Sequence, residues 1–308
     1  MRRRDGFFRT GVPDGLVDLL RDRFGIENPE PVPIDVKCAW PVFRVSGTDG
    51  KPMFVKLASS DAAAKTLSFL KSVAGCPLFP VPIAIEPVGF GGFSVLCLEW
   101  KDTVQVNAED MSDAQLDSFL DGCGRMSEAL RRYEGAVEVS GEDDPDLQYG
   151  RVANYASRHP LLGRLLVPLL SVPAVERSYA GRDLVTIHGD FQPRNYGFTG
   201  GRFAAVFDFD ALTKGLACED AAYAFTERAR RSELSVRARR RLTTLFLECA
   251  RKSEWAREDW LVAVNHARLR IAARRLDRHP DASFIAWDIA RRDRLLAVLA
   301  DALRTLNA

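Results

Sequence analysis

The sequence predicts an α+β protein, with a small antiparallel β-sheet lobe followed by a larger, mainly helical lobe. Residues 34–57 alternate in polarity and are rich in β-branched and aromatic types, and two further extended runs lie between residues 81 and 100. From Ser112 the apolar residues recur at helical spacing instead, and the chain after Glu219 keeps that pattern. A chain of 308 residues is long enough to bury a substantial core.

The first hundred residues are expected to form an antiparallel sheet with one helix. Strand character marks the runs IDVKCAW, PVFRVSG and KPMFVKL, and residues 47–50 (Gly-Thr-Asp-Gly) are typical of a hairpin loop. A helix is expected to begin at Ser60. Two more strands, Val81–Val88 and Phe93–Trp100, are expected to be joined at Gly91-Gly92.

In the second part of the chain, Ser112 is the expected N-cap of a helix, and the acidic segment EVSGEDDPDLQYG is expected to form a loop before further helix. Strand character returns in LVTIHGD, NYGF and FAAVFDF, the last two separated by a Gly200-Gly201 turn. The apolar stripes expected on the final helices contain Leu242, Leu245, Phe246 and Cys249 on one, and Trp287, Leu295, Leu299 and Leu303 on others.

Charge and cysteine content limit the class of protein. The net charge is only +1, but the chain from Glu227 onward carries 19 Lys and Arg against 11 Asp and Glu. Such an excess suits either solvated Arg-rich helix faces, which we favour, or an anionic partner. The six cysteines are scattered without a CxxC pair, and neither a signal peptide nor a membrane-spanning run is found, so a soluble, cytoplasmic protein without a membrane partner is expected.

The most informative stretch is residues 184–210, LVTIHGDFQPRNYGFTGGRFAAVFDFD. It places Asp190 and Asn195 five residues apart and puts Asp208 at the end of an apolar run. One carboxylate as a base, with an amide and a second carboxylate as oxygen ligands for a metal, is what phosphoryl transfer from a nucleotide requires.

HGDFQPRN followed by VFDFD resembles the aminoglycoside phosphotransferase and choline kinase group, the small-molecule relatives of protein kinases. The resemblance covers roughly residues 30–230 and implies a two-lobed, protein-kinase-like fold. It also implies a nucleotide-binding lobe over residues 1–98, a hinge at 99–101, and a catalytic and substrate lobe over 102–308. The implied activity is transfer of the γ-phosphate of ATP, with Mg²⁺, to a small-molecule hydroxyl.

The resemblance assigns roles to the residues of this stretch. Asp190 would accept the proton of the substrate hydroxyl, and Asn195 and Asp208 would hold the metal. His188 would support the catalytic loop by hydrogen bonding. Asp220, near the start of the next helix, would cap that helix and hold the loop. The other three histidines, His159, His266 and His279, have no metal-ligand spacing and are expected to be ordinary surface or helix residues.

In the first lobe, the resemblance makes Lys56 of MFVKL the phosphate-binding lysine and places the adenine-binding hinge at Leu98-Glu99-Trp100. Two features depart from the family pattern. The helix SSDAAAKTLSFLKSV has no Glu to pair with the lysine, and only Asp61 is a possible substitute. The nucleotide-covering loop near Cys38–Pro41 has no glycine.

The acceptor could be an amino alcohol, a sugar or an antibiotic-like compound. Candidate acceptor-binding residues on the helical lobe are Asp210, Glu219, Glu227, Trp260 and Trp287. An alternative interpretation is a kinase-fold binding or regulatory protein with weakened catalysis. A nucleic-acid-binding protein is disfavoured because no recognisable module is present. The sequence leaves open the acceptor, the choice between ATP and GTP, and the oligomeric state.

Overall fold

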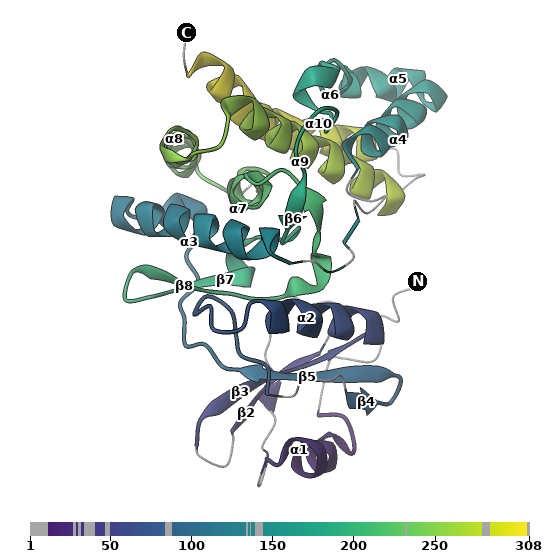
Figure 1. Cartoon of the computed structure of the whole chain (residues 1–308). Helices are drawn as coiled ribbons and strands as arrows, with labels where there is room; N and C mark the ends of the chain where they lie inside the picture. Colours follow the sequence, from purple (N-terminus) through teal and green to yellow (C-terminus); the bar gives the residue numbers. More distant parts are fainter. Residues whose placement is uncertain are drawn as a thin grey trace. The chain divides into compact units, whose positions relative to one another are not determined.

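The chain divides into two compact units (Figure 1). The N-terminal unit contains residues Met1–Thr103 and Ala205–Asp210, and the C-terminal unit contains Val104–Ala204 and Ala211–Ala308. The computed structural model describes residues 12–26, 29, 32–33, 41–46, 50–83, 88–133, 135, 137–138, 144–231, 233–278 and 284–306.

The N-terminal unit is built on an antiparallel sheet whose described strands follow the order β1-β2-β3-β5-β4. These strands are β1 (Val32–Pro33), β2 (Val42–Ser46), β3 (Pro52–Ala58), β4 (Val88–Phe90) and β5 (Phe93–Glu99). The central strand β3 pairs with β2 on one side and β5 on the other, so that Lys56 lies opposite Val42 and Leu96. The middle of the sheet therefore carries the lysine that the sequence singled out.

One helix covers each face of this sheet (Figure 1). Helix α1 (Leu16–Phe24) buries Leu16 and Leu20 against one face, which includes Val55 and Leu57 of β3. Helix α2 (Ser60–Ser72) packs on the other face, against Ala58 and Leu96. Because alternate side chains of a strand point to opposite faces, Lys56 projects toward the α2 side.

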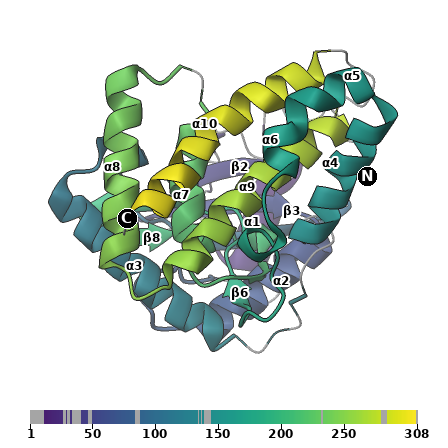
Figure 2. The same ribbon diagram turned by 90° about the horizontal axis from the view of Figure 1, so that it is seen from above.

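The C-terminal unit is mainly helical. Its longer helices are α3 (Asp113–Arg131), α4 (Pro145–Arg158), α7 (Glu219–Ala229), α8 (Val236–Lys252), α9 (Arg257–Arg278) and α10 (Ile285–Thr305). Short helices α5 (Pro160–Gly163) and α6 (Val167–Leu170) follow α4. Helices α9 and α10 run side by side, and α4 packs along α9 (Figure 2).

Two short antiparallel strand pairs place the motif residues. Strand β6 (Val185–Ile187) pairs with β9 (Thr213–Gly215), and β7 (Tyr196–Thr199) pairs with β8 (Arg202–Val206). Phe191, between β6 and β7, is fully buried among aromatic rings. Its ring centroid lies 4.9 Å from that of Tyr196 and 6.0 Å from that of Phe119 on α3. Aromatic packing thus anchors the loop that follows β6.

Several local predictions are confirmed. Helix α2 begins at Ser60, with Ser59 as its N-cap, and Ser112 caps α3 in a capping box with Gln115. Residues Gly200 and Gly201 turn between β7 and β8.

Helix α4 begins at Pro145, inside the segment expected to be a loop, because Asp144 caps it and Pro145 suits its first turn.

Other predictions are wrong or fall outside the described residues. Trp287 was expected in an apolar stripe, but 62% of its surface is exposed. Of the predicted strand over Val81–Val88, the described part begins with an isolated bridge between Pro82 and Leu98, and β4 starts only at Val88. The strand predicted over residues 34–40 and the hairpin loop at 47–49 lie outside the described residues. Among those that are described, no helix is both long and apolar enough to cross a membrane.

Candidate active site

The predicted catalytic loop leaves the end of β6 through a position that only glycine can occupy. Gly189 has φ +76°, and a Cβ atom there would lie 2.2 Å from the carbonyl oxygen of Ala211. After Asp190 the chain forms a turn of 3₁₀ helix over Pro193–Asn195 and enters β7. The backbone geometry therefore requires the glycine of the His-Gly-Asp sequence.

Several donors converge on the carboxylate of Asp190, whose side chain is 25% exposed. Oδ2 accepts hydrogen bonds from Gln192 Nε2 at 2.8 Å and from Asn195 Nδ2 at 3.1 Å. Oδ1 accepts one from the hydroxyl of Tyr223 on α7 at 3.3 Å. The guanidinium of Arg194 lies 3.4 Å from Oδ2. These contacts fix the orientation of the carboxylate while leaving it accessible to solvent.

Asn195 is buried, and its side-chain nitrogen is fully directed toward Asp190. Besides the bond to Oδ2, it donates to the backbone carbonyl of Asp190 at 2.8 Å. The Asn195 side-chain oxygen is thereby oriented away from Asp190. A neutral amide oxygen of this kind is a suitable ligand for a hard divalent cation.

His188 and Asp220 support the same loop from behind. His188 is fully buried, and its Nδ1 accepts a hydrogen bond from the backbone N–H of Asp190 at 3.3 Å. The carboxylate of Asp220 accepts the backbone N–H groups of His188 at 2.7 Å and Gly189 at 3.0 Å. The prediction that Asp220 caps its helix is wrong, because α7 begins after Cys218 with no side-chain cap. The carboxylate points to the loop instead.

Burial raises the pKa of Asp220, and the nearby His188 imidazole and the two backbone N–H groups oppose this effect. The carboxylate is buried because it fills the space between α7 and the loop. Each of the two N–H groups would be left buried without a partner if the carboxylate were removed.

Replacing Asp220 with Ala is therefore expected to lower the free energy of unfolding by at least about 2 kcal/mol. Urea denaturation followed by far-UV circular dichroism measures this change. Asp121→Ala, which removes an exposed carboxylate on α3, is the matched control and is expected to change stability by less than about 0.5 kcal/mol. Equal stability of the Asp220→Ala protein and the wild type would contradict the role given to this carboxylate.

Sequence reasoning missed two residues of this site, Tyr223 and Arg270. The Arg270 guanidinium on α9 is buried, lies 4.2 Å from the centre of the Tyr223 ring, and donates to the carbonyl of Gly189 at 3.1 Å. Burial raises the pKa of the Tyr223 hydroxyl, and Arg270 opposes that shift. Tyr223 lies three residues after Asp220, hence on the same face of α7, which is the one sequence signal that could have found it. No signal distinguishes Arg270 from the other arginines of its helix.

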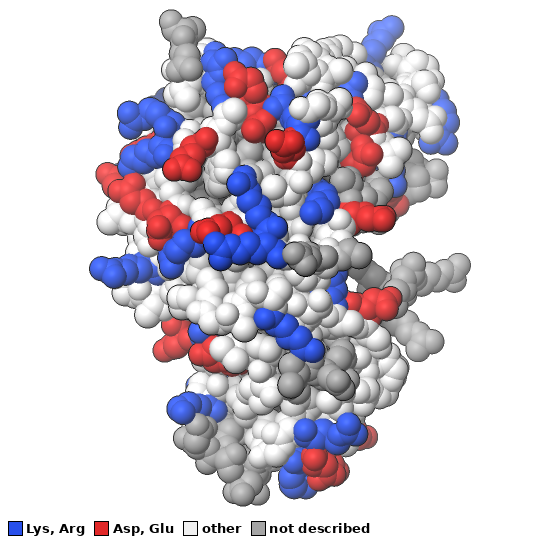
Figure 3. Space-filling view, viewed as in Figure 1, with Lys and Arg blue, Asp and Glu red and all other residues white. Residues whose placement is uncertain are grey.

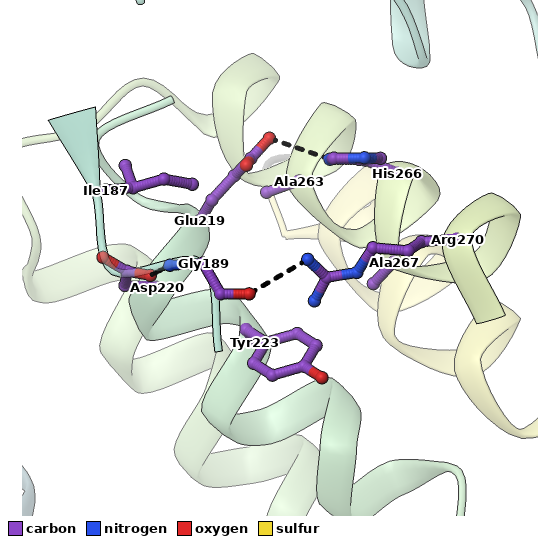
Figure 4. Close-up of a pocket in the computed structure, with 9 residues that line it drawn as sticks. All are labelled: Ile187, Gly189, Glu219, Asp220, Tyr223, Ala263, His266, Ala267 and Arg270. Atoms are coloured by element: carbon purple, nitrogen blue, oxygen red, sulfur yellow. Dashed lines mark hydrogen bonds and ion pairs between the residues drawn. The ribbon is translucent and has the colours of Figure 1, made fainter. Parts of the chain in front are cut away.

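A small cavity lies between the catalytic loop, α7 and α9 (Figure 4). Its lining residues are Ile187, Gly189, Glu219, Asp220, Tyr223, Ala263, His266, Ala267 and Arg270. Its volume of about 20 Å³ has room for about one water molecule. This cavity therefore belongs to the support of the loop.

Most of the residues proposed from the sequence to bind an acceptor contact other groups of the protein instead. Glu219 accepts a hydrogen bond from Tyr179 at 2.5 Å and contacts His266 Nδ1 at 3.2 Å. His266, expected to be a surface or helix residue, lies in helix α9 and is buried. Glu227 is buried and pairs with two arginines of its own helix end, and Trp260 is fully buried with its indole N–H on Ser253. His279 lies outside the described residues.

In the N-terminal unit, Lys56 carries a buried amine between two carboxylates. Nζ lies 2.5 Å from Asp208 Oδ1 and 2.7 Å from Asp210 Oδ2. Burial alone lowers the pKa of the Lys56 amine, but the attraction and hydrogen bonds of the two carboxylates outweigh it, so that the pKa is raised. The two carboxylates and one ammonium give this cluster of side chains a net negative charge.

Asp208 has an unusual backbone. Its φ of +66° is positive, which among the described residues other than glycine is unique to this position. Left-handed backbone costs a residue with a Cβ about 1–2 kcal/mol, although Asp and Asn tolerate it best. Such strain is commonly found at functional sites, where surrounding structure imposes it.

Asp210 links the lysine to helix α2. Its Oδ1 accepts the hydroxyl of Thr66 at 3.3 Å, while Oδ2 contacts Lys56. The preceding Phe209 is buried, with ring centroids 4.7 Å from Phe69 and 5.6 Å from Phe79. Asp61, considered from the sequence as a partner for the lysine, is exposed in the first turn of α2 instead.

Glu99 and Trp100, the residues predicted to form the hinge, lie at the end of β5. The backbone N–H of Glu99 donates to the carbonyl of Val81 at 2.8 Å, and its carboxylate accepts the Val81 N–H at 3.2 Å. The Arg44 guanidinium lies 5.3 Å from the centre of the Trp100 ring. The glycine-free segment Cys38–Trp40 lies outside the described residues.

Many of the Lys and Arg side chains in the C-terminal third are paired with carboxylates. Figure 3 shows Lys and Arg interspersed with Asp and Glu on the visible face. Paired arginines include Arg268 with Asp293, Arg275 with Asp288, Arg241 with Asp113 and Arg304 with Glu176. In the part of the chain that is described, no group of three or more His, Cys, Asp and Glu side chains is arranged to hold a metal ion.

A β-sheet unit with a buried strand lysine and a helical unit with a His-Gly-Asp loop define a protein-kinase-like α+β fold. Residues 38–261 match the phosphotransferase enzyme family, and the chain belongs to that family. No curated protein sequence matches the chain.

Solved structures with this fold include three phosphotransferases. Amicoumacin kinase bound to AMP-PNP, Ca²⁺ and Ami shares 13% identity, with a TM-score of 0.58 and coverage of 86% of this chain and 87% of that one. A thermostable mutant of aminoglycoside phosphotransferase APH(4)-Ia, bound to ADP and hygromycin B, shares 13% identity, with a TM-score of 0.56 and coverage of 92% and 98%. Macrolide 2′-phosphotransferase MphH from Brachybacterium faecium shares 15%, with a TM-score of 0.56 and coverage of 95% and 99%.

Proposed function

We propose that this protein transfers the γ-phosphate of ATP, in the presence of Mg²⁺, to a hydroxyl group of a small molecule. The observation that carries the proposal is the arrangement around Asp190, an accessible carboxylate oriented by Gln192, Asn195 and Tyr223 on a loop held by Asp220. Membership of the phosphotransferase enzyme family supports this reaction type.

Asp190 is the catalytic base of the proposal. Its carboxylate accepts the proton of the substrate hydroxyl, and the donors on its two oxygens, Tyr223 on Oδ1 and Gln192 with Asn195 on Oδ2, hold the group in place during the transfer.

Asn195, in the C-terminal unit, and Asp208, in the N-terminal unit, are proposed as magnesium ligands on their donor chemistry. Asn195 would supply a neutral oxygen and Asp208 a charged one, and Mg²⁺ prefers few protein ligands, completing its shell with phosphates and water. When bound, the ion neutralises charge on the phosphates. The side-chain nitrogen of Asn195 bonds Asp190, which leaves the side-chain oxygen as the atom proposed to meet the cation.

ATP is the proposed donor, with residues 1–98 as the nucleotide-binding lobe, 99–101 as the hinge and 102–308 as the catalytic lobe. The buried amine of Lys56 would hold phosphate oxygens, and the backbone near Glu99 and Trp100 would meet the adenine edge. An adenine nucleotide is supported by two neighbours in fold, because amicoumacin kinase binds AMP-PNP and APH(4)-Ia binds ADP. A cytoplasmic location, where ATP is abundant, completes the proposal.

The acceptor is proposed to be an amino alcohol, a sugar or an antibiotic-like compound. Neighbours in fold are named for amicoumacin and macrolides, and one is bound to hygromycin B, which supports a hydroxyl-bearing organic acceptor. The test is a screen of such compounds for Mg²⁺-dependent ADP release, with phosphorylated product detected by mass spectrometry. Lack of Mg²⁺-dependent binding of AMP-PNP, together with no product from any acceptor, would overturn the proposal.

The hydroxyl of Tyr223 is expected to contribute to kcat. In Tyr223→Phe, the ring stays on Arg270 while the hydrogen bond to Asp190 is lost, so kcat is expected to fall by about 3- to 10-fold at unchanged acceptor KM. Steady-state kinetics with an acceptor from the screen measures both constants. Tyr149→Phe, which removes a hydroxyl that bonds a backbone carbonyl on α6, is the control and should leave both unchanged. An equal loss in both variants would contradict a specific effect on Asp190.

A further inference from the structure

The helix next to the strand lysine lacks the Glu that ordinarily pairs with such a lysine, yet Lys56 is not left with a single partner. Nζ is nearly buried, with 7% of the side chain exposed, and contacts Asp210 as well as Asp208. Both carboxylates contact the Lys56 amine in this structure. Once Asp208 binds a cation, another group has to hold the lysine in position.

The contacts of Asp210 suit it to hold the lysine. Both of its carboxylate oxygens are occupied within the N-terminal unit, Oδ2 by the Lys56 amine at 2.7 Å and Oδ1 by the Thr66 hydroxyl at 3.3 Å. Thr66 lies in the middle of α2 and is itself buried. The path Lys56–Asp210–Thr66 therefore joins the central strand β3 to helix α2, which is the connection that a helix Glu would provide.

The position of Asp210 is itself fixed by packing. Phe209 packs against both Phe69 of α2 and Phe79, and the backbone N–H of Val206 donates to the carbonyl of Leu78 at 2.9 Å. These contacts hold residues 205–210 in the N-terminal unit. Asp210 has a shorter side chain than Glu, and it approaches Lys56 from the segment 205–210 rather than from helix α2.

We infer that Asp210 is the positioning residue for Lys56, replacing the absent helix Glu and tying α2 to the nucleotide-binding strand through Thr66. The inference rests on the proposed function for the role of Lys56 toward a nucleotide. It removes one of the two reasons for interpreting the chain as a catalytically weakened binding protein, because the missing Glu has a substitute, while the glycine-free loop is unaffected. It also reassigns Asp210, which the sequence offered as an acceptor-binding residue.

The primary test compares wild type, Asp210→Asn and Asp61→Asn. Asp210→Asn keeps the size of the side chain and an acceptor for Thr66 but removes the charge from Lys56, whereas Asp61→Asn removes an exposed charge from the same helix. Isothermal titration with AMP-PNP and Mg²⁺ is expected to show about 10- to 100-fold weaker binding for Asp210→Asn. Asp61→Asn is expected to bind as the wild type does.

A charge-relocation variant separates pairing from general damage. Asp210→Ala is combined with Thr66→Glu, which places a carboxylate on α2 where the hydroxyl now meets Asp210. The double variant is expected to bind AMP-PNP at least about 3-fold more tightly than Asp210→Ala alone, because the lysine regains a partner. No recovery in a folded double variant, with wild-type affinity in Asp210→Asn, would overturn the inference.

A second readout does not depend on nucleotide binding. In the nucleotide-free full chain, amide hydrogen exchange over residues 60–72 of α2 is expected to be faster in Asp210→Asn than in the wild type, with residues 16–24 of α1 unchanged. Unchanged exchange in α2 would contradict the tie between Asp210 and this helix. If the wild type fails to bind AMP-PNP, the proposed function fails while the exchange result still decides the pairing. A loss of AMP-PNP binding confined to Mg²⁺-containing buffer would make Asp210 a metal ligand and overturn the inference.

Discussion

Replacing Asp190 with Asn is expected to lower kcat by about 100- to 10,000-fold, the range that a positioned general base contributes. Asn keeps the shape of the side chain and one acceptor oxygen, enough for either the Tyr223 donor on Oδ1 or the Gln192 donor on Oδ2, but it cannot take a proton from the acceptor hydroxyl. The KM for ATP is expected to stay within about 3-fold of the wild-type value, because the carboxylate acts on the acceptor side of the reaction. Kinetics with an acceptor identified in the screen measures both constants.

The matched control for this variant is Asp121→Asn on α3, an exposed carboxylate in the same unit. Its kinetics and its unfolding curve are expected to equal those of the wild type. Wild-type turnover by a folded Asp190→Asn protein would show that another group removes the proton.

Replacing Asp208 with Asn is expected to lower kcat by about 100- to 1,000-fold and to abolish most of the Mg²⁺ dependence of AMP-PNP binding, because the charged ligand of the cation is lost. Asn suits the φ of +66° at this position, and Lys56 keeps Asp210 as its partner, so the fold is expected to persist. Titration calorimetry with AMP-PNP, with and without Mg²⁺, measures the second effect directly.

A comparison of Asp208→Asn with Asp208→Ala separates chemistry from backbone strain. Both lack the carboxylate, so both are expected to lose the same activity. Ala in the left-handed region is expected to cost about 1 kcal/mol more of unfolding free energy than Asn. Activity retained in either variant would argue against Asp208 as a metal ligand, whatever the stability.

Much of the fold could be predicted from the sequence because the signals are local. The capping residues Ser59 and Ser112 mark where helices begin, and the Gly200-Gly201 turn marks where a hairpin closes. Such features depend on a few neighbouring residues, and tertiary contacts rarely override them. Trp287 shows the limit of periodicity, because an apolar residue at helical spacing is buried only if another element covers it.

The candidate site divides in the same way. The spacing from His188 to Asn195 fixes a tight loop in which these side chains must come close, so the sequence is sufficient to identify them. The donors that orient Asp190 from other elements are less accessible to sequence reasoning. Tyr223 is 33 residues away, and Arg270 contacts Gly189 across 81 residues. Their positions depend on how α7 and α9 pack, which no local pattern encodes.

The sequence by itself determined the reaction class, phosphotransfer, because HGDFQPRN and FDFD place the predicted base and the two predicted oxygen ligands at fixed backbone intervals. Only the tertiary structure decided what holds those groups. It directed Asp220 to the loop rather than to the end of its helix, and it gave Lys56 a partner 154 residues away in Asp210 instead of the nearby Asp61. The physical reason is that a charged side chain pairs with whichever opposite charge the packing of the core brings within reach, and sequence distance does not enter that choice.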